Sequence, residues 1–438
     1  MIDLAQLRRE PDLVAKSLGR RGVSTDEVAA LVAADARHRE VLQRAEGLRA
    51  QVKELSRQVA DARRNGDIAT ADALVLESRR VGEDEAAAQE IAEAKGVDVR
   101  ERLLMLPNLP SPDAPDGLDE SGNVELRRWW PGMDEGQDPP TFQEHQRVPH
   151  WDIGRELGLL DLEAGARLSG SMFPLYRGDG SRLLRALGAY ALDQHADSYE
   201  EVRPPTLVLT ETMVSTGHLP KNEEEMYAVE RDGLWAIPTA EVPLTSMHRG
   251  EIVDEARLPI RLTALTACFR REAGAAGRDT RGVLRTHEFD KVELFSYCTP
   301  EQAQDCFNDV LARAEALLRD LGLMYRVLDL CCGDLGTSSA RTFDLEVYAP
   351  GVDMWLEVSS VSWFRDFQAR RANVRYRPAG GSPTLVHTVN GSALAWSRIW
   401  PTIVETYRNP DGTVTVPKVL RPFFGGRELI GPQTSRRS

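Results

Sequence analysis

The chain has 438 residues, 42% of them hydrophobic, which is enough for a full-sized core in two or more domains. A net charge of -14 and a pI near 5.2 argue against a generally basic nucleic-acid coat, although local arginine clusters can still bind phosphate. The five cysteines lack paired zinc spacing, and neither a signal peptide nor a membrane span is evident. We therefore expect a cytoplasmic protein with reduced thiols and no membrane partner.

The first part of the chain predicts a helical hairpin. Ser24 with Glu27 has the spacing of a capping box. After them, apolar residues alternate steps of four and three, which is typical of a coiled-coil seam, at Val41, Ala45, Leu48, Val52, Leu55, Val59 and Ala62. Residues 65–67 (NGD) break this helix, and Leu74, Val81 and Ala88 predict a second one. The pattern alone favours a dimerisation or scaffold coiled coil over nucleic-acid binding.

The rest of the chain predicts a linker and then an α+β domain. Residues 106–150 are rich in proline and glycine, so we expect a helical arm at 1–105, a linker at 106–150 and a second, larger domain at 151–438. Helix-like residues 181–196 mix with strand-like runs at 262–269, 291–296 and 343–348. Because helices and strands do not alternate evenly and no phosphate-binding glycine motif occurs, an antiparallel sheet with flanking helices is preferred.

Two segments with paired polar residues are candidates for a ligand site. Thr239 and Glu241 lie two apart in IPTAEVPLT and have the same spacing as Arg270 and Glu272 in the run at 266–295. On an extended backbone, residues two apart point to one face. A guanidinium matches phosphate oxygens in a bidentate manner. The alternatives are a solvated strand edge for the first pair and a salt bridge across strands, for example to Glu293, for the second.

Two later segments add further candidates. Glu357 and Ser360 form an oxygen-only pair of the kind that Mg²⁺ accepts, but on a strand they share a face only if a bulge lies between them. Residues 390–392 (NGS) predict a strand-to-helix turn with Arg398 on the first turns of the helix, where it would meet a phosphate. The alternative for Arg398 is an arginine that extends from a capped core helix to solvent.

Taken together and in this order, these segments resemble the seryl-tRNA synthetases, a family of class II aminoacyl-tRNA synthetases. The resemblance covers nearly the whole chain. It rests on the hairpin and on LPNLPSPDAPDG, VPHWDIGRELGLLD, TAEVPLT, FRREAGAAGRDTRGVLRTHEFDKVE, DFQARR, NGS and VPKVLRPFFGG. It implies ATP-dependent activation of L-serine to seryl-adenylate and transfer to tRNA(Ser), with tRNA(Sec) left open as a further substrate. It also implies an antiparallel six- to seven-stranded sheet with flanking helices.

The resemblance also implies roles for individual residues. The serine-binding residues would be Thr239, Ala240, Glu241, Glu293, Asn390 and Ser392. ATP would contact Arg270, Arg271, Glu272, Thr286, Glu357, Val358, Ser359, Ser360 and Arg398. Arg270 and Arg398 would be catalytic, at the α- and γ-phosphates, and Glu357 with Ser360 would hold Mg²⁺. Arginines and a metal ion that stabilise charge on phosphate oxygens remove the need for a protein nucleophile.

The partners follow from the same resemblance. The hairpin would grip the long arm of tRNA through Arg57, Arg63 and Arg64, and the loop arginines Arg278, Arg281 and Arg285 would meet its acceptor end. A homodimer would form around residues 201–205 (EVRPP).

Departures from the family pattern keep two alternatives open. They are Ala393, Trp396 and Ser397 after NGS, and Trp363 before the DFQ stretch. One alternative is a specialised duplicate for secondary metabolism or inhibitor resistance. The other is a non-catalytic coiled-coil tRNA-binding module.

Overall fold

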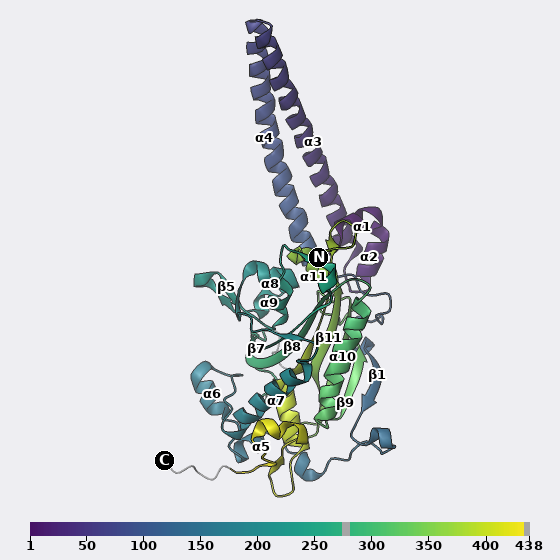
Figure 1. The fold of residues 1–438 in the computed structure, drawn as a ribbon, viewed down its shortest axis with the longest axis vertical. Coiled ribbons are helices and arrows are strands. Elements are labelled where there is room, and N and C mark those ends of the chain that lie inside the picture. The colour runs from purple at the N-terminus through teal and green to yellow at the C-terminus, as the bar shows by residue number, and fades with distance from the viewer. Residues whose placement is uncertain (274–280, 433–438) are drawn as a thin grey trace. The chain divides into compact units, whose positions relative to one another are not determined.

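The computed structural model describes residues 1–273 and 281–432, and the chain divides into two compact units (Figure 1). One unit is Ile2–Pro107, and the other contains Asn108 and the rest of the chain. Among the described residues, no helix is both long and apolar enough to span a membrane.

The first unit is the predicted helical hairpin. Two short helices, α1 (Leu4–Arg9) and α2 (Pro11–Gly19), precede the long helices α3 (Thr25–Arg64) and α4 (Ile68–Met105), which run side by side (Figure 1). The capping box at Ser24 is confirmed, because its side chain accepts from the Glu27 amide while Glu27 accepts from the Ser24 amide. The Asn65–Asp67 turn is also confirmed, with Gly66 at a φ of 77°.

Small side chains hold the two long helices together. Ala45 of α3 and Ala71, Val81, Ala88 and Ala92 of α4 are buried, and the remaining predicted seam residues are half-buried. Arg49 adds an exposed ion pair to Glu85 of the facing helix, at 3.1 Å. A thin apolar seam with a charged exterior is the pattern of a solvent-exposed coiled coil.

The second unit is built on a mixed sheet with eight strands among the described residues. Their order across the sheet is β1 (Val124–Trp129), β9 (Tyr325–Asp329), β10 (Arg341–Ala349), β11 (Met354–Arg365), β14 (His387–Ala395), β8 (Glu288–Cys298), β7 (Ile260–Phe269) and β2 (Glu200–Glu201). All neighbours pair antiparallel except β2, which pairs parallel with β7. The antiparallel α+β prediction is confirmed, with a slightly larger sheet than expected.

The strand β1 lies inside the segment that was expected to be a linker. It pairs with β9, and Asn108 donates hydrogen bonds to the Ser338 and Phe364 carbonyls. Residues 108–150 therefore belong to the larger unit. The alternation of charged and apolar residues in VELRRW suits an edge strand, which the proline-rich flanks concealed.

The α-helices described in the second unit are α5 (His150–Glu156), α6 (Leu162–Ser169), α7 (Asp179–His195), α8 (Thr210–Thr216), α9 (Glu241–Ser246), α10 (Ala303–Asp320), α11 (Phe367–Ala372) and α12 (Trp396–Thr406). Helices α7, α10 and α12 pack against strands of the sheet and enclose the main core. Helix α10 packs on β14 and β11, where a Cβ on Gly391 would lie only 2.5 Å from Val310. Phe307, Leu317, Ile399 and Trp400 fill this core. A side chain at position 391 would push the helix off the sheet.

Small sheets complete the second unit. They are formed by β13 (Thr384–Leu385), β12 (Arg375–Arg377) and β6 (Ile252–Asp254), by β15 (Val414–Thr415) and β16 (Leu429–Ile430), and by β3 (Leu207–Leu209), β5 (Leu234–Ala236) and β4 (Ala228–Val229). The sheet of β12, β13 and β6 packs with α9 and α11 in a second core that includes Leu244, Ala369 and Tyr376. This second core anchors the segments that carry Glu241 and Gln368.

Candidate active site

Two adjoining cavities open on the large sheet. The larger, of about 230 Å³, is lined by polar side chains that include Thr239, Glu241, Asn222, His218, Ser338, Ser362 and Asn390. The smaller, of about 40 Å³, is lined by Glu272, Leu284, Arg285, Thr286, Phe289, Val358, Ala395, Ser397 and Arg398. Arg270, Lys291, Glu357 and Ser392 line both cavities. A ligand that spans the two would pass these four side chains.

The alternation of strand β8 explains how one strand serves both the core and the cavities. Its even-numbered residues Val292 and Leu294 are buried in the main core. Phe289 and Lys291, on the opposite face, line the cavities. Glu293 follows on that face, and its carboxylate bonds Thr239 and Asn390, which line the larger cavity. Because side chains alternate along a strand, hydrophobic packing on one side fixes the charged residues on the other.

Glu293 is a fully buried carboxylate at the centre of a polar network. Its Oε2 lies 2.5 Å from Lys291 Nζ and accepts from the Thr239 hydroxyl at 2.8 Å, while its Oε1 accepts from Asn390 at 2.9 Å. A buried charge persists only when a counterion and hydrogen bonds replace water. The network therefore maintains an anionic group beneath the larger cavity.

Glu241 is a second buried carboxylate in the same region, at 9% exposure. Burial and the nearby charge of Glu293 raise the pKa of Glu241 to about 7. Its Oε1 accepts a 2.6 Å hydrogen bond from Gln368, and its backbone amide donates to the Thr239 hydroxyl. Two neighbouring carboxylates with different environments can take different proton states and so recognise different groups of one ligand.

The extended geometry expected around Thr239 and Glu241 is wrong. Ala240 caps helix α9 and Glu241 is its first residue, because Pro243 fits the first turn of a helix. Ala240 is fully buried in the second core and does not line either cavity. Thr239 and Glu241 still reach the same cavity, through a helix start rather than a strand face.

The same correction applies to Arg270 and Glu272. Strand β7 ends at Phe269, and Glu272 adopts a φ of 49°, so the backbone is not extended there. The Arg270 guanidinium lies 5.1 Å from the Phe289 ring centroid and its Nε donates to the Pro238 carbonyl, which leaves the terminal nitrogens to the cavities that Arg270 lines. The salt-bridge alternative holds instead for Glu272, which pairs with Arg285 at 2.8 Å.

Arg271 lies apart from the cavities. It donates to the Glu224 carbonyl, and its amide donates to the Glu225 carbonyl. Ala273 donates from its amide to the Glu225 carboxylate at 3.1 Å. These bonds fasten the end of the Arg270 segment to the short helix at Glu223–Glu225.

A bulge in β11 brings Glu357 and Ser360 together, as the spacing required. Ser359 pairs with Leu345 and Glu357 with Glu346, so Val358 is an extra residue between consecutive pairs. Both Glu357 and Ser360 line the larger cavity. The Ser359 hydroxyl instead donates to the Ser392 carbonyl.

Charges around Glu357 balance one another. Desolvation would raise the pKa of Glu357, but the guanidinium groups of Arg398 and Arg270 outweigh it and hold that pKa below its ordinary value. Arg398 lies 3.4 Å from the carboxylate and also donates to the Glu357 carbonyl at 2.5 Å. Burial and the charge of Glu357 raise the pKa of nearby Asp344. Among the described residues Asp344 Oδ1 has no hydrogen-bond partner.

The prediction that NGS forms the turn into a helix is wrong, because the helix begins several residues later. Asn390, Gly391 and Ser392 lie within β14, paired with β8, and α12 begins only at Trp396 after a bulge in which Leu394 has a φ of 75°. The close approach of α10 at Gly391 explains why the strand continues. Arg398 is in the first turn of α12, as expected.

The departures from the family pattern lie in different surroundings. Ser397 lines the smaller cavity, whereas Ala393 and Trp396 are buried in the main core. Trp363 does not line either cavity and donates to His387 at 3.4 Å.

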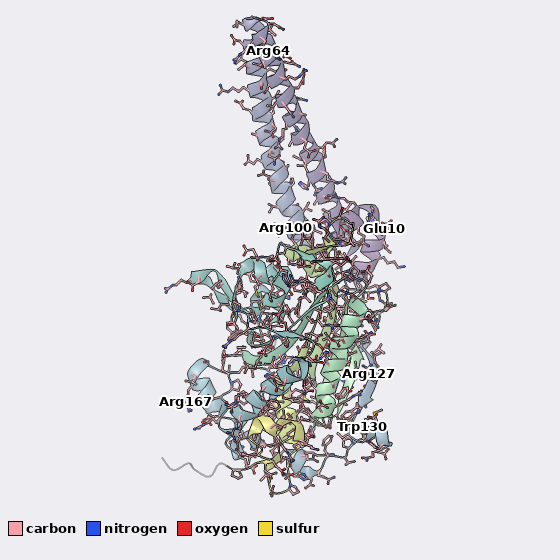
Figure 2. All side chains as sticks on the ribbon, in the orientation of Figure 1. Glu10, Arg64, Arg100, Arg127, Trp130 and Arg167 are labelled. Atoms are coloured by element: carbon pink, nitrogen blue, oxygen red, sulfur yellow. The ribbon has the colours of Figure 1, made fainter. Side chains whose placement is uncertain are left out.

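The candidate tRNA-binding arginines lie in two places. Arg64 lies at the tip of the hairpin, as the last residue of α3 (Figure 2). Arg57 and Arg63 precede it on the same helix, and the exposed Arg57 and Arg64 pair with acids of that helix. Arg281 lies over the Trp151 ring, and Arg285 faces the smaller cavity. Arg278 lies outside the described residues.

Several cavity residues were missed from the sequence. Lys291 and Phe289 were detectable, because they alternate with Glu293 on one strand. His218 was not detectable, because it follows α8, which is distant in the sequence from the other cavity residues. Burial, followed by the charge of Arg270, lowers the pKa of His218 to about 3. Gln368 does not line the cavity but bonds Glu241, a role that the DFQARR segment does not reveal.

Most strands of the antiparallel sheet, with Arg270 and Glu357 at the junction of the two cavities, lie in a segment that matches the class II aminoacyl-tRNA synthetases. The family model for the class II core domain of the synthetases for G, H, P, S and T matches residues 227–407. The model for the seryl-tRNA synthetase N-terminal domain matches residues 1–110.

Full-length relatives identify the family. A serine–tRNA ligase of Gemmatimonas aurantiaca is 46% identical over 97% of this chain and 99% of that protein. A serine–tRNA ligase of Nitratidesulfovibrio vulgaris is 45% identical over 98% of this chain and 100% of that protein. The seryl-tRNA synthetase of Pyrococcus horikoshii, solved with ATP, superposes with a TM-score of 0.90 at 33% identity, covering 99% of this chain and 100% of that one. The chain belongs to the seryl-tRNA synthetase family.

Proposed function

We propose that the two cavities activate L-serine with ATP and that the chain transfers the seryl group to tRNA(Ser). The observation that carries this proposal is the junction of an acidic cavity, suited to an amino acid, with an arginine-lined cavity, suited to a nucleotide, through Arg270 and Lys291. The solved relatives from Pyrococcus horikoshii and Naegleria fowleri contain ATP and AMP respectively, which supports ATP as the nucleotide.

In this proposal, serine occupies the larger cavity. The buried anion Glu293, held by Thr239 and Asn390, pairs with the ammonium group. Glu241 meets the side-chain hydroxyl, and Ser392, at the junction of the cavities, lies beside the substrate carboxylate. Ala240 contributes only its backbone, because its side chain is in the core.

ATP occupies the smaller cavity and the junction. Arg270 is proposed for the α-phosphate and Arg398 for the γ-phosphate, since both guanidiniums line that space. Glu272 and Thr286 face the adenosine part, and the Thr286 hydroxyl has no partner within the described residues, so it is available to a ligand. Val358 and Ser359 shape the wall through the β11 bulge, while Arg271 braces the loop.

The residues present fit a magnesium ion. Glu357 and Ser360 lie on either side of the bulge at Val358, and both line the larger cavity. Asp344 pairs with Ser360 across the strands and has an oxygen that lacks a hydrogen-bond partner among the described residues. An oxygen-only set with two carboxylates is the chemistry that Mg²⁺ prefers. When bound with ATP, the ion supplies Lewis-acid stabilisation of phosphate charge.

The residues act by positioning and charge rather than as a nucleophile. The substrate carboxylate attacks the α-phosphorus and pyrophosphate departs, so negative charge builds on phosphate oxygens near Arg270. Glu293 holds the ammonium and thereby aims the carboxylate toward the junction. Lys291, which also lines the junction, adds a positive charge.

Amino-acid-dependent ATP–pyrophosphate exchange tests the assignment. We expect exchange with serine and at least about 100-fold lower kcat/KM with alanine or glycine, because an unfilled hydroxyl site leaves a buried acid unpaired. No serine-dependent exchange, or equal exchange with alanine, would contradict the serine assignment.

The hairpin unit is proposed as the tRNA-binding arm of residues 1–105. Replacing Arg57, Arg63 and Arg64 together by alanine should raise the KM for tRNA(Ser) about tenfold and flatten its salt dependence, because three phosphate contacts are lost. Serine-dependent exchange should not change. Charging assays at several salt concentrations measure both effects.

The matched control for the arm is Arg128→Ala. Arg128 pairs with an acid three residues away, as Arg57 does, but lies on β1 of the other unit. It should leave the KM for tRNA unchanged. An equal rise in both proteins would show a nonspecific charge effect and contradict the arm assignment.

A homodimer and a cytoplasmic location complete the proposal. The Glu201–Pro205 stretch starts on β2, the edge strand beside β7, and an unpaired strand edge is suited to contact with a second copy. A cytoplasmic location is proposed because the product serves protein synthesis.

A further inference from the structure

Gln368 connects three elements that meet beneath the larger cavity. It is fully buried on α11 and lies between Glu241 of α9 and Thr388 of β14. Its Nε2 donates to Glu241 Oε1 at 2.6 Å, and its Oε1 accepts from the Thr388 hydroxyl at 2.7 Å. The same Nε2 also approaches the Thr216 carbonyl at 3.4 Å. Both ends of the amide are therefore engaged.

This chain of bonds fixes the direction of the amide. The Glu241 oxygen accepts from the amide nitrogen, and the Thr388 hydroxyl, which could donate or accept, donates to the amide oxygen on the other side. If the amide flipped, its oxygen would meet a carboxylate oxygen in a buried site, which is unfavourable. One oxygen of Glu241 is thus committed as an acceptor.

We propose that Gln368, oriented by Thr388, is a positioning residue that holds Glu241 for recognition of the side-chain hydroxyl of the amino acid. The inference rests on the proposed role of Glu241 in serine binding. Glu293 already has Lys291, Thr239 and Asn390 as partners, which suits it to the ammonium common to all amino acids. Gln368 donates to Glu241 but has no hydrogen bond to Glu293 among those of the described residues, so its effect falls on the hydroxyl.

The experiment compares two inhibitors that differ only in this hydroxyl. Inhibition constants of serinamide and alaninamide are measured in serine-dependent ATP–pyrophosphate exchange for the wild type, Gln368→Met, Thr388→Val and Thr388→Ser. Gln368→Met removes all the hydrogen bonds of the amide, to Glu241, Thr388 and Thr216, at similar volume, whereas Thr388→Val removes only the bond to the amide oxygen. Thr245→Val is the control, because Thr245 is a buried threonine of α9 whose hydroxyl has no partner among the described residues.

Gln368→Met should raise the inhibition constant of serinamide about tenfold and that of alaninamide less than about twofold. This difference corresponds to the loss of roughly one buried hydrogen bond that only serinamide makes. Thr388→Val should change the ratio of the serinamide and alaninamide inhibition constants in the same direction, and Thr388→Ser should restore the wild-type ratio. The KM for ATP should equal that of the wild type in every variant. The control Thr245→Val should give the inhibition constants of the wild type.

Equal weakening of both inhibitors, or an unchanged ratio, would overturn the inference. If Gln368→Met does not fold, as thermal unfolding would show, the comparison of Thr388→Val with Thr388→Ser decides. A wild type that lacks serine-dependent exchange would instead contradict the proposed function, so the two failures are distinguishable.

Discussion

Arg270→Ala is expected to lower kcat for serine-dependent ATP–pyrophosphate exchange by about 10²- to 10³-fold, the usual cost of removing one preorganised donor at a developing anion. The guanidinium lines both cavities and is held against Phe289, with its Nε 3.4 Å from the Pro238 carbonyl. It is therefore positioned before the substrates arrive. Because charge on the α-phosphate peaks in the transition state, kcat should fall more than the KM for ATP rises.

Two further variants separate charge from geometry. Arg270→Lys keeps the charge but loses the planar fork, so it should recover only part of the rate. Arg377→Ala removes an exposed arginine on β12, away from the cavities, and should behave as the wild type. An Arg270→Ala enzyme with unchanged kcat and a raised KM for ATP would show ground-state binding only and would contradict the catalytic role.

The sequence predicted the elements better than the local geometry of the site. The strand at 291–296 and the helix near 181–196 are present as β8 and α7, because long periodic runs depend on the packing of many residues. In contrast, the position of Glu241 depends on a helix start and that of Glu272 on a left-handed residue. Such features involve one or two residues and leave no periodic signal.

Most side chains that contact the site carboxylates could not be predicted from the sequence pattern either. Lys291 could have been inferred from its alternation with Glu293. His218 lines the larger cavity, and Gln368 bonds Glu241 from outside the lining, only because α8, α9 and α11 pack together, which is long-range tertiary structure. The bulge at Val358 is the exception, since the three-residue spacing of Glu357 and Ser360 required it for a shared face.

Glu293→Gln should reduce kcat/KM for serine by at least about 100-fold, the cost of removing one partner of a buried ion pair with the substrate ammonium. It should also destabilise the fold by about 3 kcal/mol, because Lys291, 8% exposed, is left buried without its counterion. Exchange kinetics and urea unfolding measure the two effects independently. The difficulty is that a less stable protein can lose activity for that reason alone.

The double variant Glu293→Gln with Lys291→Met resolves this difficulty. Removing both charges leaves no uncompensated ion in the core, so the free energy of unfolding should return to within about 1 kcal/mol of the wild type. The kcat/KM for serine should stay low, because the ammonium still lacks its anion. Lys291→Met alone leaves Glu293 buried without its cation and shows how much of the loss comes from the lysine. If the double variant recovered serine activity together with stability, Glu293 would be only the structural partner of Lys291, and the ammonium would have to bind elsewhere in the cavity.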